Sequence, residues 1–342
     1  MAKNYNAGRR RPAAAAPAEP APGDAALDDA EWDDAFVAAL SGVVGADCAG
    51  LRLDQALART FPQYSRNRLQ AWLKTGHVTV TRDGTPLPAE GSAPVLGGEA
   101  VELRPPPAAD VAQPPAQRMP LKIVHEDDDL IVLDKPAGLI VHPGAGNPDR
   151  TLMNGLLAHA PSLRQVPRAG IVHRLDKDTS GLMVVAKNVT AQAHLAAQLA
   201  ARTVKRTYLA LVHGDPPARG MVDAQIGRDP RSRTRMAVTR RGKEARTRFE
   251  VLERFGHAAL VECRLETGRT HQIRVHMQHV RIPVIGDPVY RRMARHGVNF
   301  PRQALHATAL ELVHPRTGKA MRWEAPLPAD MKLLLERLRR DG

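Results

Sequence analysis

The peptide 170–182 has the strongest chemical character in the chain, because it places one carboxylate among three potential cations. Asp176 follows His173 and Arg174 and precedes Lys177. Turn-forming residues come next, and then an apolar run that predicts a buried strand. A carboxylate on a loop before a core strand is held rigidly yet stays reachable, and the cations would keep it ionised. This pattern suits an acidic nucleophile or base that meets a polyanion; a solvated basic loop with one structural carboxylate is the alternative.

A second group of candidate residues spans 269–277, where Arg-Thr-His-Gln-Ile-Arg-Val-His-Met predicts a helix that ends before Pro283. His271, His276 and His279 raise the question of a zinc site. Their spacing is not His-x3-His, however, and no nearby carboxylate or cysteine completes a ligand set. We therefore expect no metal here.

A third candidate is Tyr208, one of only four tyrosines in the chain. It lies in the alternating stretch 205–212, which predicts a strand, and it follows the basic pair Lys205 and Arg206. A strand tyrosine ordinarily packs into a core. An aromatic ring beside cations can also stack on an extruded base, an interaction worth about 1–3 kcal/mol.

The charge balance indicates a polyanionic partner. The 342 residues carry a net charge of +13, and residues 228–248 hold nine positive charges against two acids. Such a stretch repels itself unless a polyanion neutralises it, and RNA phosphate is the natural candidate. An anionic membrane surface is the rival, but no basic amphipathic helix with a Trp/Phe/Leu face is evident.

Cysteine content and hydropathy bear on the compartment. Cys48 and Cys263 are the only cysteines, so neither a disulfide framework nor a metal quartet fits within one chain. No apolar run approaches the roughly 20 residues that span a bilayer. We expect a cytoplasmic protein that does not enter the membrane.

Composition divides the chain into four parts. Residues 1–47, rich in Ala, Pro and Asp, are typical of a disordered tail with a short helix around 33–40. Residues 48–104 predict a small domain, and 105–120 a Pro-rich, semi-rigid linker. Residues 121–342 are expected to form the large domain.

The small domain predicts two helices followed by strands. Asp54 is expected to cap the first helix and Ser65 the second. The order of elements, with Ser-Arg-Asn-Arg-Leu at 65–69 and Gly-His-Val at 76–78, resembles the S4 RNA-binding domain. That resemblance implies phosphate contacts, which position RNA without reading its sequence. An ordinary domain with a solvated basic face is the alternative.

Three motifs of the large domain resemble those of the RluA/RluD family of RNA pseudouridine synthases. They are His-Arg-Leu-Asp-Lys-Asp-Thr-Ser-Gly-Leu at 173–182, Asp-Lys-Pro-Ala-Gly-Leu-Ile-Val-His-Pro at 134–143, and the peptide 269–277. The resemblance covers roughly residues 48–342 and is closest to the RluD branch, which modifies large-subunit ribosomal RNA. It implies an α+β fold: a mixed α/β catalytic domain around a central antiparallel sheet with an active-site cleft, plus the S4-like domain.

The same resemblance assigns roles to residues. Asp176 would be the catalytic carboxylate, Arg274 the arginine that pairs with it, and Tyr208 the active-site tyrosine that stacks on the base. The expected substrate and RNA contacts are Arg174, His173, Ile273, Arg66, Arg68 and Lys74. In the first motif, Pro136 and Gly138 are expected to pack against the active loop, with phosphate contact by Lys135 and His142 as the less favoured alternative.

Pseudouridylation breaks the bond from uracil N1 to ribose C1′, rotates the base and rejoins it through C5. The reaction needs no cofactor, and Asp176 would either attack C1′ or remove a sugar proton. The expected partner is RNA, and a monomer is expected. Two alternatives remain: a non-catalytic RNA-binding or ribosome-assembly factor, and a base-releasing hydrolase, which would need a second acid for water. Asp178 is the only close candidate for that acid.

Overall fold

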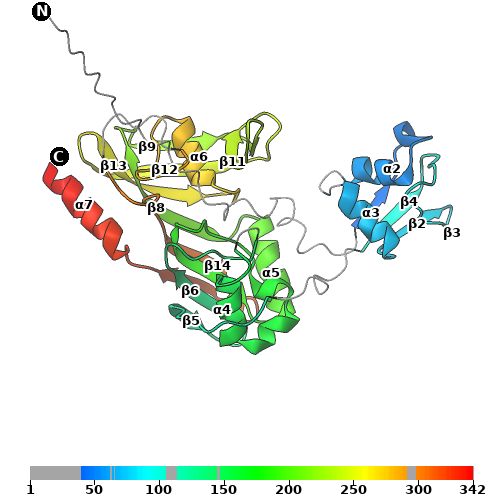
Figure 1. The fold of residues 1–342 in the computed structure, drawn as a ribbon, viewed down its shortest axis with the longest axis horizontal. Coiled ribbons are helices and arrows are strands. Elements are labelled where there is room, and N and C mark those ends of the chain that lie inside the picture. Colours follow the sequence, from blue (N-terminus) through cyan, green and yellow to red (C-terminus); the bar gives the residue numbers. More distant parts are fainter. Residues whose placement is uncertain are drawn as a thin grey trace, which may run out of the picture.

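The computed structural model describes two folded units (Figure 1). The ranges described are 40–61, 64, 66–104, 114–144, 147–290 and 298–341. The tail and most of its expected helix, the proposed cap Ser65 and much of the proline-rich linker lie outside these ranges. None of the described helices is long and apolar enough to cross a membrane.

The small unit is a four-stranded antiparallel sheet with two helices. The strand order is β1-β4-β2-β3. Its elements are β1 (Leu40–Val43), η3 (Ala46–Cys48), α2 (Leu53–Thr60), α3 (Arg66–Lys74), β2 (Val78–Arg82), β3 (Thr85–Leu87) and β4 (Ala100–Leu103). Leu40 pairs with Leu103, so the ordered unit begins before residue 48 and the predicted tail boundary is too late.

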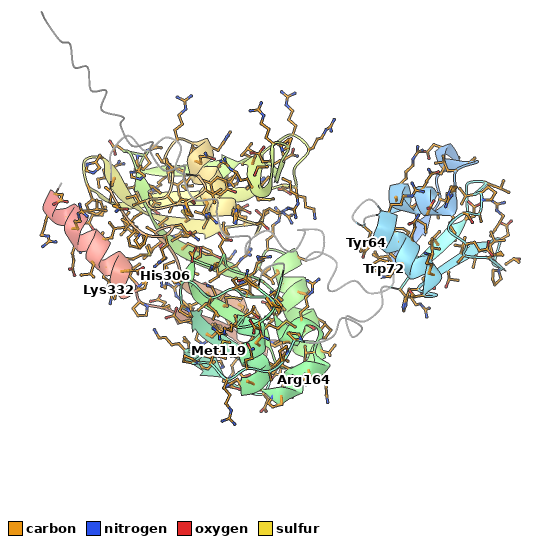
Figure 2. The ribbon with its side chains drawn as sticks, viewed as in Figure 1. Tyr64, Trp72, Met119, Arg164, His306 and Lys332 are labelled. Carbon is orange, nitrogen blue, oxygen red and sulfur yellow. The ribbon has the colours of Figure 1, made fainter. Side chains whose placement is uncertain are left out.

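The core of the small unit joins the helices to the sheet. Leu57 from α2, Leu69 from α3 and Leu103 from β4 are fully buried. Figure 2 labels Tyr64 and Trp72, whose rings meet edge-to-face with centroids 4.9 Å apart. These contacts pack the two helices that the sequence predicted against one face of the sheet.

Asp54 does not cap α2, contrary to the prediction. The N-cap residue is Arg52, and Asp54 is buried in the first turn. There its carboxylate accepts hydrogen bonds from Arg52, Arg66 and Gln70. Burial alone would raise the pKa of Asp54, but these donors outweigh it and lower the pKa. The sequence pattern correctly placed Asp54 at the start of α2 but gave it the wrong role. Its partner Arg66 lies in α3, twelve residues further along the chain.

The large unit is built on one extended sheet. Its strand order is β5-β6-β7-β14-β8-β13-β12-β9, with β15 paired to β14. The strands are β5 (Ile123–Glu126), β6 (Leu130–Lys135), β7 (Ser180–Ala186), β8 (Lys205–His213), β9 (Arg219–Asp223), β12 (Arg246–Arg254), β13 (Ala258–Leu265), β14 (Leu305–Val313) and β15 (Ala320–Glu324). All pairs are antiparallel except β7 with β14, so the expected central antiparallel sheet is present with one parallel pair.

Helices and a separate hairpin surround this sheet. They are α4 (Leu152–His159), η5 (Pro161–Gln165), η6 (Pro167–Gly170), α5 (Val189–Ala200), α6 (Gln272–His279), α7 (Ala329–Asp341) and the hairpin β10 (Ile226–Asp229) with β11 (Ser232–Val238). The predicted helix at 269–277 begins three residues late, because His271 adopts left-handed backbone angles as its N-cap.

Strand β7 shows how the sheet is buried on both faces. Every residue of β7 is buried. Met183 and Val185 pack into the larger core cluster, whereas Leu182 and Val184 pack into a second cluster with Leu195 of α5. This two-sided burial follows the period-two geometry of a strand and fixes the position of the loop that precedes β7.

We predict that Gly181→Ala strongly destabilises the large unit. Gly181 has a φ of 117°, and an added Cβ would collide with the backbone oxygen of Ala307 on the parallel strand β14. Separating these strands costs about 3 kcal/mol or more. Gly256→Ala is the control, since Gly256 also has a positive φ but has open space at the Cβ position. It should cost about 1–2 kcal/mol. Urea unfolding would measure both; equal losses would contradict the predicted clash.

Candidate active site

A cavity of about 670 Å³ gathers the candidate residues of the large unit. Its walls include the loop 172–176, residues Arg206 and Tyr208 of β8, and the peptide 265–274. Another wall is the alanine-rich face of α5, formed by Ala193, Ala196, Ala197 and Ala200. Motifs that lie far apart in the sequence therefore face one volume.

Asp176 and Arg274 meet at the cavity wall. Nη1 of Arg274 donates to Oδ2 of Asp176 over 2.8 Å. The Arg274 side chain is 1% exposed, whereas that of Asp176 is 14% exposed and faces the cavity. The arginine thus orients the carboxylate from the protein side and leaves its other face open to a ligand.

The same guanidinium also binds a second carboxylate. Nε and Nη2 of Arg274 donate to the two oxygens of Asp287, over 2.7 and 3.2 Å. Asp287 is fully buried and also accepts the backbone amides of Val289 and Tyr290. Burial would raise the pKa of Asp287, but Arg274 and these amides outweigh it and lower the pKa. Asp287 therefore fixes the orientation of Arg274.

Groups from two other segments hold the loop that carries Asp176. Lys135 is fully buried, and its Nζ donates to the carbonyls of Pro136, Leu139 and Lys177. Arg302 donates to the carbonyl of Asp178 over 3.0 Å. Lys135 thus packs the first motif against the active loop, as favoured from the sequence, and it is too deeply buried for the alternative phosphate contact.

A series of polar contacts runs from the Met236 amide through Tyr290 and His271 to Asp176. The hydroxyl of Tyr290 accepts the Met236 amide of β11 over 3.0 Å and lies 2.9 Å from Nδ1 of His271. If the hydroxyl donates to Nδ1, the His271 ring proton is on Nε2, which lies 4.0 Å from Oδ1 of Asp176. The guanidinium groups of Arg235 and Arg274 also lie over the Tyr290 ring, 5.5 and 5.1 Å from its centroid.

Tyr208 and Ile273 form apolar parts of the cavity wall. Tyr208 is 6% exposed and Ile273 is 3% exposed. Burial raises the pKa of Tyr208 to about 12, so its phenol keeps its proton at neutral pH. The ring can therefore contact an aromatic base while its neutral hydroxyl serves as a hydrogen-bond donor.

His173 faces the cavity but acts as an acceptor within the protein. Its Nε2 accepts the Val184 amide over 3.0 Å. Burial, with a smaller contribution from Arg206, lowers the pKa of His173 to about 3. The imidazole is therefore neutral at pH 7 and is no cation for phosphate. Arg174, next along the loop, is partly exposed in the cavity wall.

The expected RNA contacts of the small unit lie on α3, outside this cavity wall. Lys74 is exposed at the end of the helix. Arg66 is exposed as well, yet its guanidinium pairs with buried Asp54 at 2.9 Å. The side chain of Arg68 lies outside the described set.

Sequence reasoning missed Asp287, Tyr290 and the structural role of Lys135. Gly-Asp-Pro at 286–288 was the available signal, because it places a single carboxylate directly after the apolar peptide 282–285. A buried carboxylate among apolar residues predicts a cationic partner. The sequence does not show that the partner is the arginine that also holds Asp176.

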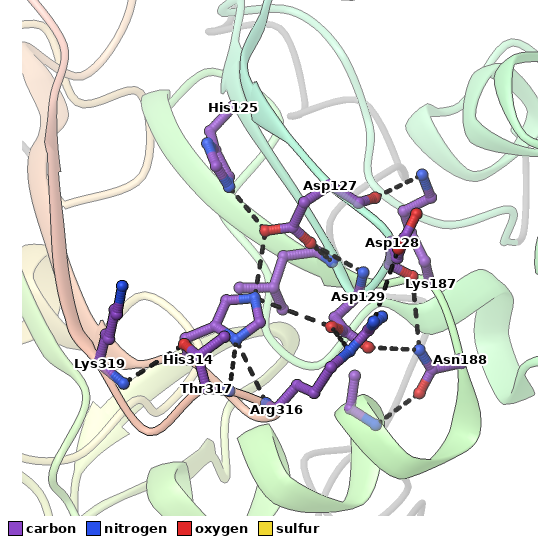
Figure 3. Close-up of polar contacts among 12 residues, drawn as sticks. His125, Asp127, Asp128, Asp129, Lys187, Asn188, His314, Arg316, Thr317 and Lys319 are labelled. Atoms are coloured by element: carbon purple, nitrogen blue, oxygen red, sulfur yellow. Dashed lines mark hydrogen bonds and ion pairs between the residues drawn. The ribbon is translucent and has the colours of Figure 1, made fainter.

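Figure 3 shows a carboxylate–histidine cluster formed by Asp127, Asp129 and His314, whose ligand atoms are close enough for a metal ion. Their contacts argue against that use. Nδ1 of His314 accepts the amides of Arg316 and Thr317, so Nε2 carries the proton and donates to Asp127. The Arg316 guanidinium also lies 2.6 Å from Asp129. The chain's own donors thus occupy the atoms that a metal ion would need as ligands.

The cavity gives no support to the water-activating acid that a base-releasing hydrolase needs. Asp178, the candidate from the sequence, is absent from the described lining. Glu266 does line the cavity, but its carboxylate pairs with Arg246 and Arg248 at 3.1 and 2.7 Å. Among the described residues that line the cavity, Asp176 is therefore the carboxylate that the active loop directs into it.

We predict that Asp287→Asn destabilises the large unit by about 3–5 kcal/mol at pH 7, because it leaves Arg274 with one carboxylate in a buried site. The free energy of unfolding in urea would measure this. Asp341→Asn is the control, since its pair with Arg337 is exposed, and it should cost less than about 1 kcal/mol. Similar losses in both variants would argue against the central role of Asp287.

The same pair predicts a pH dependence. Because the folded state lowers the pKa of Asp287, the stabilisation is fully present above the unfolded pKa near 4 and is lost as the pH falls further. Asp287→Asn should therefore reduce the loss of stability between about pH 4 and pH 2. An unchanged acid profile would contradict this assignment.

Comparisons with known proteins agree with this geometry. The family model described as RNA pseudouridylate synthase matches residues 129–279. A curated relative from Nitrosomonas europaea, named ribosomal large subunit pseudouridine synthase D, is 55% identical over 297 residues, covering 85% of each chain. A Pseudomonas aeruginosa relative of the same name is 49% identical over 308 residues, covering 86% of this chain and 94% of its own.

Solved structures show the same likeness in the large unit. Human RNA pseudouridylate synthase domain containing 4 is 27% identical with a TM-score of 0.52, covering 64% of this chain and 93% of that one. Human RNA pseudouridylate synthase domain containing 1 is also 27% identical, with a TM-score of 0.50, covering 66% and 97%. The chain therefore belongs to the RluA/RluD family of RNA pseudouridine synthases, isomerases that convert uridine in RNA to pseudouridine.

Proposed function

We propose that this enzyme isomerises specific uridines in large-subunit ribosomal RNA. The relatives from Nitrosomonas europaea and Pseudomonas aeruginosa carry that substrate in their names. The net charge of +13 supports a polyanionic substrate. The single observation that carries the proposal is the cavity-facing carboxylate of Asp176, held by Arg274 at 2.8 Å.

In the proposed reaction Asp176 acts at the ribose of an extruded uridine. The bond from N1 to C1′ breaks, the uracil turns, and a bond forms from C5 to C1′. C5 then loses its proton and N1 gains one, so that the product is an isomer of uridine. Arg274 keeps the carboxylate oriented throughout, because Asp287 holds it from behind. Tyr208 stacks on the uracil and Ile273 borders it, so the base is held while it turns. Water is not a reactant, which suits a site with one directed carboxylate.

The remaining expectations complete the proposal. Residues 48–104, extended by β1, would serve as the S4-like RNA-binding domain, with Arg66, Arg68 and Lys74 near phosphates. Residues 105–120 would link it to the catalytic domain 121–342. Arg174 would contact the extruded nucleotide, and His173 would support the loop as a neutral acceptor. We place the enzyme in the cytoplasm as a monomer that needs no cofactor and no membrane. Family membership disfavours a non-catalytic assembly factor.

We predict that wild-type enzyme releases tritium from large-subunit RNA transcribed with uridine labelled at C5, and that Asp176→Asn lowers the rate by about 1000-fold or more. Asparagine keeps the shape of the side chain and removes the charge that acts at the ribose. RNA binding, measured on filters, should persist in the variant.

Two outcomes would contradict the proposal. Release of free uracil would indicate base hydrolysis. RNA binding by the wild type without tritium release would rule out large-subunit RNA as the substrate. Small-subunit and transfer RNA labelled in the same way would then be tested.

A further inference from the structure

Arg206 is a cavity residue to which the proposed reaction gives no task. It lies in the central strand β8, where Arg206 pairs with Leu265 of β13 and Leu310 of β14. Residues two apart in a strand share a face, so Arg206 and Tyr208 point to the same side of the sheet. Both line the cavity that contains Asp176. The guanidinium is thus carried by one of the most rigid elements of the catalytic domain.

The charge of Arg206 is not compensated by the protein. The residue is 9% exposed, and its Nε is buried without a hydrogen-bond partner. Within the residues that the structure describes, no carboxylate pairs with it. Burial lowers the pKa of Arg206; Tyr208 acts in the opposite direction, and the nearby cation Arg269 lowers the pKa further. The surroundings therefore disfavour a positive charge that an arginine nevertheless keeps at neutral pH.

Two other cations in the cavity wall pair with carboxylates. Arg274 has both Asp176 and Asp287. Arg202 pairs with Glu244 at 2.6 Å. A buried charge normally has a partner, because its desolvation costs several kcal/mol. The exception at Arg206 indicates that an anion from outside the chain completes the site.

The backbone beside Arg206 is shaped to admit the guanidinium. A Cβ at Gly268 would lie 2.5 Å from Nη1 of Arg206. A side chain there would push the guanidinium from its place. Gly268 precedes Arg269 in the 267–270 turn, which lines the same cavity. The turn therefore keeps Arg269 close to the site while leaving room for the guanidinium of Arg206.

We propose that Arg206 binds a phosphodiester of the RNA substrate, next to the uridine whose base stacks on Tyr208. The inference rests on the proposed RNA substrate. Arg206 and Tyr208 are about 7 Å apart along the strand, a separation that one nucleotide covers between its phosphate and its base. The nucleotide is then held at two ends, because Arg206 binds its phosphate and the Tyr208 ring stacks on its base. Arg269 contributes to the same positive potential.

The test compares Arg206→Met with Arg206→Lys and with a control, Arg322→Met. Methionine preserves the apolar stem and removes the charge, whereas lysine keeps the charge. Arg322 lies on the edge strand β15, pairs with Glu311 and Glu324, and is outside the cavity lining. Its variant changes the net charge by the same amount. Three quantities are measured: the salt dependence of binding to large-subunit RNA, tritium release, and the urea midpoint.

Arg206→Met should weaken RNA binding and raise KM by about 10- to 100-fold, the loss expected for a hydrogen-bonded charge. The slope of log affinity against log salt should become shallower by about 0.7 for one phosphate of a single strand. The urea midpoint should stay the same or rise, because a buried charge without a partner is removed. Arg206→Lys should keep the wild-type slope, and Arg322→Met should match the wild type in all three measurements.

Three outcomes would overturn the inference. An unchanged salt slope with a lower kcat would assign Arg206 to the neutral uracil or to the positioning of Tyr208. A lower urea midpoint in both Arg206 variants would give it a structural role. Equal losses of affinity in Arg206→Met and Arg322→Met would reduce the effect to net charge. Wild-type tritium release in the same preparations tests the proposed substrate separately, since it does not depend on any Arg206 variant.

Discussion

The catalytic centre depends on one buried guanidinium shared between two carboxylates. Arg274 is 1% exposed, and a charge so deeply placed is costly unless its hydrogen bonds are met. Its three guanidinium nitrogens donate hydrogen bonds to Asp176 and Asp287. An ammonium could not serve both carboxylates in this way, since it lacks the planar arrangement of donors. The direction of Asp176 is thus set by a group that cannot itself relax into solvent.

Contacts from the surrounding protein hold both Arg274 and the active loop in place. Asp287 is fixed by the backbone amides of Val289 and Tyr290, and Arg274 is fixed by Asp287. Lys135 and Arg302 hold the loop carbonyls after Asp176, with Nζ and Nη1 at 2.9 and 3.0 Å. The loop therefore needs no ligand to take up its conformation. In the reaction proposed above, preorganisation of this kind would let Asp176 act at the ribose without a reorganisation cost.

Local patterns in the sequence predicted the elements well. Alternation over 205–212 predicted β8, and the apolar run after the turn-forming residues that follow Asp176 predicted β7. Each prediction depends on a pattern that the strand shows by itself. The failures have one cause. Asp54 was assigned to a cap, and Lys135 was considered only for a phosphate contact, which was the less favoured alternative for its motif. Both are buried charges with a partner from another segment.

Arginines are equivalent in a sequence and become distinct only through their partners. The chain has 49 basic residues, and their excess predicts a polyanion without saying which of them touch it. Arg246 binds Asp223 and Glu266, so it supports the sheet edge. Arg274 binds two acids and orients one of them, Asp176, toward the cavity. Arg206, in contrast, is buried without an acidic partner among the described residues. A cation bound by the chain's own carboxylates or carbonyls, as Arg274 and Lys135 are, is thus committed to the fold, and Arg206 is the one for which we propose a ligand. For an enzyme whose substrate carries a charge at every nucleotide, that distinction separates the architecture of the site from its recognition of RNA.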